Sequence, residues 1–245
     1  MRPPVQIAFR RKVRAVWLER GLELASGGRS WPEAKAALAG EVAAENPGAE
    51  TIRKVLEHIR RVWFDSPEDC HGLRDEALRI YRAAHGPEVV LPLIWGMAIS
   101  AYPFVGSVAE TLGRLLRLQP DALRSDVQRR MRERHGDRDF VSRITRYNIS
   151  SFLDWGVIVE TKDGGAYHAA RTVRPRSPEV TAWLLEAVLI SRNVAQMPLS
   201  QITHHPLLFP IVCEEFNAMF LRSNRRLKSV RQGMNEEWIA LEKTP

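Results

Sequence analysis

Cysteine is scarce in this 245-residue chain. Its two cysteines, Cys70 and Cys213, lie 143 positions apart. Two isolated thiols cannot build a disulfide framework, and no two cysteines stand at the spacing of a zinc knuckle. We therefore expect a protein of a reducing compartment, the cytoplasm, with no metal held by cysteine.

Lysine is scarce as well, and acidic residues are outnumbered. The chain carries 36 basic and 29 acidic residues, which gives a formal charge of +7, and only six of the cations are lysines. The planar guanidinium of arginine can donate two parallel hydrogen bonds to phosphate, so this balance favours a nucleic-acid partner. Codon usage in a GC-rich genome is the alternative source of so much arginine, and on that reading the charge says nothing about a ligand.

The common catalytic motifs are missing. The sequence has no G-x-x-x-x-G-K-[ST] loop, no G-x-G-x-x-G turn and no G-x-S-x-G elbow. Asp121 with Glu160 and Lys162 formally spells a PD…ExK nuclease pattern. We expect Asp121 to cap a helix and Lys162 to lie beside a glycine turn, which is not the mixed sheet that this metal-dependent chemistry needs.

Histidine gives no better candidate for chemistry. His204 and His205 are adjacent, as are Cys70 and His71, and adjacent side chains on a helix point apart. No second pair stands at the spacing of metal ligands. We predict no catalytic residue, no cofactor and no metal, and therefore a protein that is not an enzyme.

One long segment lacks charge altogether. Residues 89–109 contain no Asp, Glu, Lys or Arg, which is the signature of a possible membrane span. Pro103 divides this run into a short buried helix and the start of the next one. The basic N-terminus is not followed by the apolar stretch of a secretory signal. We therefore predict a protein without a membrane segment.

The first hundred residues have clear helical patterning. Ser30, Pro32 and Glu33 form the signature of a helix start, and apolar residues recur at three and four positions over residues 50–64. The predicted helices cover residues 5–24, 30–45, 50–64, 67–84 and 89–101. We expect residues 1–102 to form an all-helical bundle.

A different pattern begins at Pro103. Helices are predicted over residues 107–118, 121–134 and 138–155, and two strands, residues 157–162 and 166–170, flank the turn Asp163-Gly164-Gly165. Three helices and a hairpin in this order are typical of a winged helix-turn-helix. We assign residues 103–176 to such a domain, with the hairpin as its small β wing.

The tail, residues 177–245, leaves two interpretations open. A helix capped by Ser177 is predicted to about residue 192, and a helical stretch over residues 208–221. Residues 226–242 fit either another helix or a hairpin of strands 227–231 and 238–241. With the hairpin, the tail is a second, degenerate winged helix. The fold class is mainly α in either case.

The third helix of a winged helix-turn-helix enters the major groove, while the wing and neighbouring cations hold phosphates. If Val141, Ile144, Phe152 and Leu153 pack inward, polar residues form two outer rows on this helix. The predicted DNA-binding residues are Arg138, Ser142, Arg143, Arg146 and Tyr147 on this helix, Arg129 and Arg130 on the one before, and Lys162, Arg171 and Arg174 in and after the wing.

Two further basic runs, residues 2–14 and 222–231, contain no acid and could follow a phosphate backbone. The alternative for all of these cations is a solvated surface or an acidic protein partner.

Several segments resemble a known family. Residues 18–25 followed by Gly28-Arg29-Ser30-Trp31, residues 50–63, Leu93-Ile94-Trp95 and Tyr102-Pro103-Phe104-Val105 are similar to BrxA, a small component of BREX bacteriophage-exclusion systems. The likeness covers about residues 15–160. The chain departs from the family in its longer tail and in the absence of charged residues between Trp95 and Tyr102. The resemblance implies a helical bundle with a winged helix, and a cytoplasmic DNA-binding accessory protein of an anti-phage system.

The sequence thus predicts a non-enzymatic protein that binds double-stranded DNA through its winged helix, with other defence proteins as further partners. The alternative is an adaptor that docks larger defence enzymes through the winged helix and the apolar segment 207–220, without binding DNA. The sequence does not specify an oligomeric state.

Overall fold

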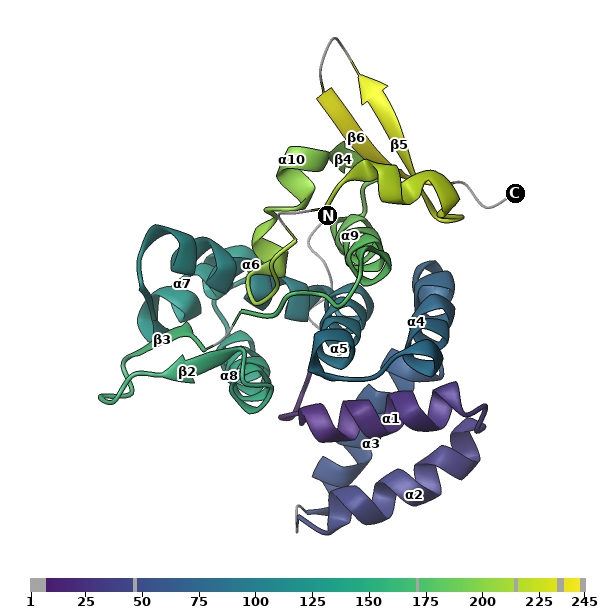
Figure 1. The fold of residues 1–245 in the computed structure, drawn as a ribbon. Helices are drawn as coiled ribbons and strands as arrows, with labels where there is room; N and C mark the ends of the chain where they lie inside the picture. Colours follow the sequence, from purple (N-terminus) through teal and green to yellow (C-terminus); the bar gives the residue numbers. More distant parts are fainter. Residues whose placement is uncertain (1–7, 46–47, 171, 214–215, 233–235, 243–245) are drawn as a thin grey trace.

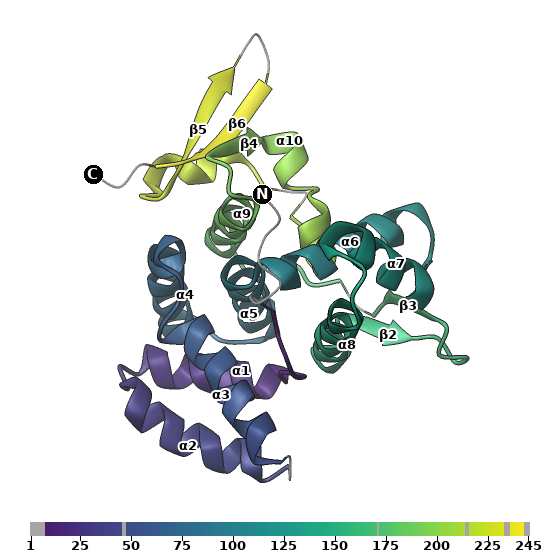
Figure 2. The same cartoon turned by 180° about the vertical axis from the view of Figure 1, so that it is seen from behind.

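The structure is a computed structural model that describes residues 8–45, 48–170, 172–213, 216–232 and 236–242. The chain is mainly helical, as predicted, with two small antiparallel sheets. In Figures 1 and 2 helix α5 lies at the centre, with α1 to α4 on one side, α6 to α8 on another and the tail on a third. The first five helices are α1 (Ala15–Ser26), α2 (Trp31–Ala43), α3 (Ala49–Trp63), α4 (His71–Ala83) and α5 (Pro87–Ala101), with a 3-10 turn η1 (Glu68–Cys70) before α4.

The helices of the bundle follow the sequence pattern. Helix α3 buries Val55, Ile59 and Val62 on one face and leaves Arg53 and Arg60 exposed on the other. At the start of α2 the backbone N–H of Ser30 donates to the Glu33 carboxylate at 2.8 Å, the predicted capping contact. The predicted helices over residues 30–45, 50–64, 67–84 and 89–101 are therefore confirmed within a few residues. The helix predicted over residues 5–24 is wrong at its start, because α1 begins only at Ala15.

The charge-free run is divided between α5 and α6 (Pro103–Leu118). Within the described residues no single helix is long and apolar enough to cross a membrane, and α5 and α6, which pass that test only as a pair, are bent by 116° at Tyr102. Every residue of α5 from Val89 to Ala101 is buried inside the protein. This segment is hydrophobic on all sides because α5 is surrounded by protein.

After α6 the chain forms β1 (Asp121–Leu123), α7 (Arg124–His135), α8 (Asp139–Asp154), β2 (Ile158–Glu160) and β3 (Ala166–Ala169). The predicted order of three helices and a hairpin is present. The sheet has the order β1-β3-β2, with His168 opposite both Asp121 and Val159. One expectation was wrong: Asp121 does not cap a helix, because it pairs with β3 as the first residue of β1.

The tail contains α9 (Pro178–Arg192), β4 (Gln196–Pro198), α10 (Leu199–Ile202), the 3-10 turns η2 (Pro206–Leu208) and η3 (Ala218–Ser223), and the hairpin β5 (Leu227–Gln232) and β6 (Glu236–Leu241). Residues 226–242 therefore take the hairpin alternative. The helical stretch predicted over residues 208–221 is wrong in length, because the described residues of this stretch form no helix longer than the 3-10 turns η2 and η3. The sheet order β4-β6-β5 repeats that of β1-β3-β2.

Three tryptophans join segments that are far apart in the sequence. Trp95 donates through Nε1 to the Leu207 carbonyl at 2.8 Å, Trp155 to the Val13 carbonyl at 2.9 Å and Trp183 to the Leu73 carbonyl at 2.8 Å. All three rings are buried in one hydrophobic core that draws residues from the bundle, the middle part and the tail. The predicted boundaries at residues 102/103 and 176/177 coincide with the α5–α6 bend and the start of α9, but the parts that they separate share this core.

Candidate nucleic-acid interface

Helix α8, the predicted third helix, follows α7 in the chain and precedes the β2–β3 hairpin, and Figure 1 shows it beside β2. Val141, Ile144 and Phe152 are buried on its inner face, as expected, while Leu153 is half-buried. Buried Asn148 on the same helix donates to the Ile144 carbonyl at 2.7 Å and to the Phe9 carbonyl at 3.3 Å. The inner face of α8 therefore contacts both the core and the N-terminal segment.

The outer face of α8 carries the exposed cations. Arg138, at the helix start, and Arg143 and Arg146 are exposed, and none of them forms an ion pair with another described residue. The Arg143 guanidinium lies over the Phe140 ring, 5.6 Å from its centroid. Ser142 is half-buried beside them. These arginines keep their charge available to a partner.

Residues 8–14 form an arm that lies along α8. The Val13 N–H donates to Ser151 Oγ at 2.9 Å, and the Ala15 N–H donates to Asp154 Oδ1 at 3.0 Å. Arg14 Nε also donates to the Asp154 carboxylate at 3.0 Å, and Lys12 Nζ lies 3.1 Å from it. Part of the first basic run is thus fixed against the end of α8.

Tyr147 is covered by this arm and is not an open groove residue. The Arg11 guanidinium lies over its ring, 5.4 Å from the centroid, and approaches its hydroxyl at 3.5 Å. Arg11 also donates to Thr51 Oγ1 of α3 at 3.2 Å. Arg143 precedes Tyr147 by one turn on the same side of α8. The arm therefore brings a second cation close to the outer face of this helix.

The pKa of buried His58 indicates the positive field around the arm. Burial lowers this pKa, and the charges of Arg10, Lys54, Arg61 and Arg11 lower it further, to about 3. His58 Nε2 accepts the Arg10 N–H at 3.0 Å, and Nδ1 lies 3.0 Å from the Tyr102 hydroxyl. His58 is thus surrounded by cations of both the arm and α3.

The two arginines of α7 that were predicted to bind DNA are engaged elsewhere in the protein. Arg129 pairs with Asp126 at 3.0 Å and with Glu133 at 2.8 Å on its own helix. Arg130 is half-buried and lines a separate cavity beside Glu110. Neither residue joins the exposed cations of α8.

The hairpin wing carries one exposed cation at its tip. Lys162 is exposed next to Asp163, whose carboxylate accepts from Thr161 Oγ1 at 2.6 Å and from the Gly165 N–H at 3.1 Å. These hydrogen bonds lower the pKa of Asp163. The tight turn also depends on Gly164, whose φ is +68°. The side chain of Arg174 is exposed beyond the wing, and Arg171 lies outside the described residues.

The chain matches no known protein family, no curated protein and no solved structure.

The residues of the nuclease pattern do not form a catalytic group. Asp121 and Glu160 lie on the two outer strands with β3 between them, and Glu160 forms an ion pair with Arg124. Asp121 lies 3.6 Å from His168 Nδ1. In the described part of the chain no three His, Cys, Asp or Glu side chains are placed to hold a metal ion. Burial raises the pKa of the Cys70 thiol to about 12, which disfavours the thiolate.

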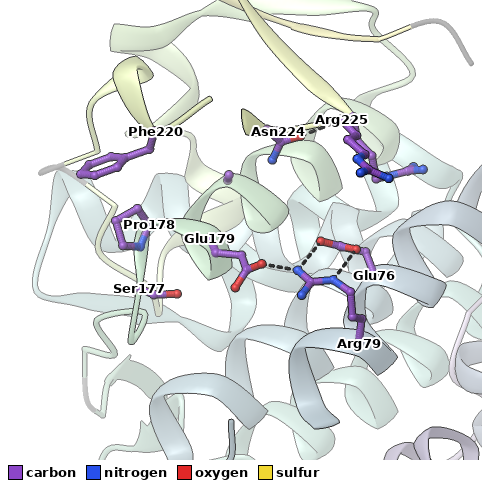
Figure 3. Close-up of a pocket in the computed structure, with 10 residues that line it drawn as sticks. Glu76, Arg79, Ser177, Pro178, Glu179, Phe220, Asn224 and Arg225 are labelled. Atoms are coloured by element: carbon purple, nitrogen blue, oxygen red, sulfur yellow. Dashed lines mark hydrogen bonds and ion pairs between the residues drawn. The ribbon is translucent and has the colours of Figure 1, made fainter. Parts of the chain in front are cut away.

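A cavity of about 940 Å³ lies between α4, the start of α9 and η3 (Figure 3). In its wall Arg79 is held between two carboxylates, donating to Glu76 at 2.7 Å and pairing with Glu179. Phe220 on η3 also lines it and is 51% exposed, and its neighbour Met219 is 61% exposed. Among the described residues of the predicted apolar docking segment, Leu207 and Leu208 are buried, and the large apolar side chains that are exposed, Met219 and Phe220, lie at its end.

The sequence indicated the exposed arginines of α8 but missed the arm and the pairing on α7. The arm contacts α8 across about 140 positions of the sequence, and no local pattern reveals a contact of that kind. The ion pairs of Arg129 could have been expected, because Asp126 and Glu133 stand three and four positions away on one helix.

Proposed function

We propose that residues 103–176 form a winged helix-turn-helix and that the chain binds duplex DNA through it without modifying the DNA. The observation that carries this proposal is the set of three exposed arginines on the outer face of α8, Arg138, Arg143 and Arg146, which have no acidic partner among the described side chains. Helix α8 would enter the major groove, and Lys162 on the hairpin would contact the adjacent backbone.

The order of elements supports this assignment. A helix, a short strand, two helices and a hairpin follow one another, and the first strand pairs with the last in the sheet order β1-β3-β2. The tail has the same sheet order, but its described residues contain no long helix in the third position. We propose that the tail is a degenerate winged helix that supports the first one and does not read DNA.

The test is a fluorescence-anisotropy titration of the whole chain onto labelled duplexes of mixed sequence, at about 50 to 300 mM salt. We expect the logarithm of the binding constant to fall linearly with the logarithm of the salt concentration. The double variant Arg143→Ala/Arg146→Ala should bind at least about tenfold more weakly, with a slope smaller by up to about 2. Arg53→Ala, an exposed arginine on α3 with Glu50 and Glu57 as partners, is the matched control.

No binding at about 50 mM salt would refute DNA binding, and unchanged binding by the double variant would refute the assigned surface.

We further propose an accessory role in a bacterial anti-phage system, together with other defence proteins. The support is the resemblance of residues 15–160 to BrxA. Phage plating efficiency on cells that carry the defence system tests this role. We expect phage to form plaques on cells that express the double variant at Arg143 and Arg146 as efficiently as on cells from which the gene has been deleted. Full protection by that variant would separate the defence role from DNA binding.

The second candidate is the adaptor, and the exposure of Met219 and Phe220 beside the 940 Å³ cavity favours it. Exposed aromatic and methionine side chains at a hollow are typical of protein interfaces. If DNA binding is absent, Phe220→Ser should weaken binding of purified defence enzymes, with Arg53→Ala again as the control.

A further inference from the structure

A cluster of arginines surrounds one buried carboxylate where α6, α7 and α9 meet. Glu110 is only 2% exposed, and it accepts from Arg114 Nη2 at 2.7 Å, Arg134 Nη1 at 2.8 Å and Arg192 Nη1 at 3.0 Å. Burial raises the pKa of Glu110, but its contacts with Arg134, Arg192 and Arg114 lower it by more, so the carboxylate stays ionised. Glu110 therefore holds three helices together.

The charges in this cluster do not balance. Arg130 lines the same cavity of about 310 Å³, so that four guanidinium groups surround one carboxylate and leave a net charge of +3. Nearby His205 adds no charge near neutral pH. Its pKa is lowered to about 4 by burial and by Arg192, Arg114 and Arg117, although Glu110 opposes them.

The cluster also holds more donors than acceptors. Each guanidinium has five N–H donors, whereas one carboxylate offers about four acceptor positions, of which three are used. The Nε of Arg130 is buried and has no hydrogen-bond partner in the described part of the chain. Arg114, at 58% exposed, and Arg134, at 42%, extend from the buried carboxylate toward solvent. The unused donors thus belong to groups around an open cavity.

We propose that this cavity is a binding site for a phosphate group, held between Arg114, Arg130, Arg134 and Arg192. Arginine forks fit phosphate oxygens in pairs, and a dianion here would reduce the repulsion among the four cations. The phosphate would come either from a free phosphate compound or from a DNA backbone. The site is separate from the exposed arginines of α8 and does not depend on the function proposed for those arginines.

The test is thermal unfolding of the whole chain in increasing inorganic phosphate, with chloride as the reference at equal ionic strength. We expect a saturable rise in Tm, of about 3–6 °C at a phosphate concentration ten times Kd. Arg114→Gln and Arg130→Gln should each weaken phosphate binding about tenfold. Arg132→Gln, which removes an exposed α7 arginine paired with Asp137, should leave it unchanged.

The Glu110→Gln variant distinguishes a ligand-binding site from a cluster that only stabilises the fold. This variant should unfold at a lower temperature than the wild type in chloride but gain a larger Tm rise from phosphate, since the competing carboxylate is gone. Arg114→Gln, at an exposed position, keeps the test valid if Glu110→Gln does not fold. An equal phosphate response in the wild type and Arg114→Gln would overturn the proposal, because phosphate also stabilises proteins non-specifically.

Two further measurements identify the source of the phosphate and keep this proposal distinct from the first. If the Tm response is present and Arg114→Gln also weakens duplex binding, the ligand is a backbone phosphate; unchanged duplex binding assigns the site to free phosphate. The double variant at Arg143 and Arg146 should keep the full Tm response. Loss of the response in that variant would refute a separate site.

Discussion

Gly96 on α5 shows how closely individual residues are packed in the core. A Cβ atom at Gly96 would lie 2.3 Å from Cζ3 and 2.6 Å from Cη2 of Trp183 on α9. Trp183 is buried and bonded to the Leu73 carbonyl, so its ring has little room to move. The α5–α9 contact therefore requires a residue without a side chain at this position.

We expect Gly96→Ala to lower the free energy of unfolding by about 1–3 kcal/mol, because the added methyl overpacks the core. Gly40→Ala on α2 is the matched control, since its Cβ would meet nothing within 4 Å. That change should raise the free energy of unfolding by about 0.5–1 kcal/mol through helix propensity. Urea unfolding measures both, and wild-type stability in Gly96→Ala would show that α5 and α9 are less tightly packed.

His58 and His135 are buried, and their depressed pKa values make stability depend on pH. Burial is the main cause for both, and the values are about 3 and about 4. The unfolded chain, with a histidine pKa near 6.5, binds more protons than the folded one. Stability should therefore be complete above about pH 6.5 and fall as pH drops toward 3, by roughly 2 kcal/mol per residue at pH 5.

Urea unfolding between pH 7.5 and pH 5 tests this dependence. His58→Gln, which keeps an acceptor for the Arg10 N–H, should lose part of the acid-induced decrease in stability. The same decrease in the variant and the wild type would show that His58 does not contribute to it.

At the scale of helices and strands, the sequence predicted the long helices and both hairpins but missed the short strands β1 and β4. Helix α3 has a strong three-to-four periodicity that marks one buried face. Strands β1 and β4 have three residues each, too few for any periodic signal, and they form only because β3 and β6 lie beside them. The exposed face of α8 was predictable from its own spacing, whereas the arm that covers Tyr147 was not, since it comes from the other end of the chain.

Asp154 fixes the arm to α8, so its loss should release the arm. Asp154→Ala removes the acceptor of the Ala15 N–H and the partner of Arg14 and Lys12, and we expect a cost of about 2–4 kcal/mol. Limited trypsin digestion with mass spectrometry should then detect faster cleavage within residues 10–14. Asp137→Ala, at an exposed loop carboxylate, is the control. Equal cleavage rates in Asp154→Ala and the control would show that other contacts hold the arm.

At the scale of the whole molecule, one core joins the bundle, the middle part and the tail. The composition changes at residues 103 and 177 suggested separate units, because sequence patterns report local structure and not which faces later meet. Trp95 and Trp183 are bonded to carbonyls 112 and 110 positions away. Interior packing of this kind couples the parts energetically.

We therefore expect the chain to unfold in a single transition. Circular dichroism at 222 nm should report the helices, and tryptophan fluorescence should report the seven indoles, which include Trp95, Trp155 and Trp183 at the junctions. The two midpoints should coincide, as they do in two-state unfolding. Two separated transitions would show that the parts are stable on their own.

The contacts of the arm also determine how early the N-terminal part of the chain can finish folding during synthesis. Val13 leaves the ribosome 142 residues before Trp155, its hydrogen-bond partner. At about 5–20 residues per second, this interval is roughly 7–28 s. During that time the arm is made but its contacts with α8 cannot form, and the face of α5 that packs on α9 stays uncovered until residues 178–192 follow. The nascent chain therefore exposes apolar surface until its later helices emerge, and transiently exposed surface of this kind promotes aggregation.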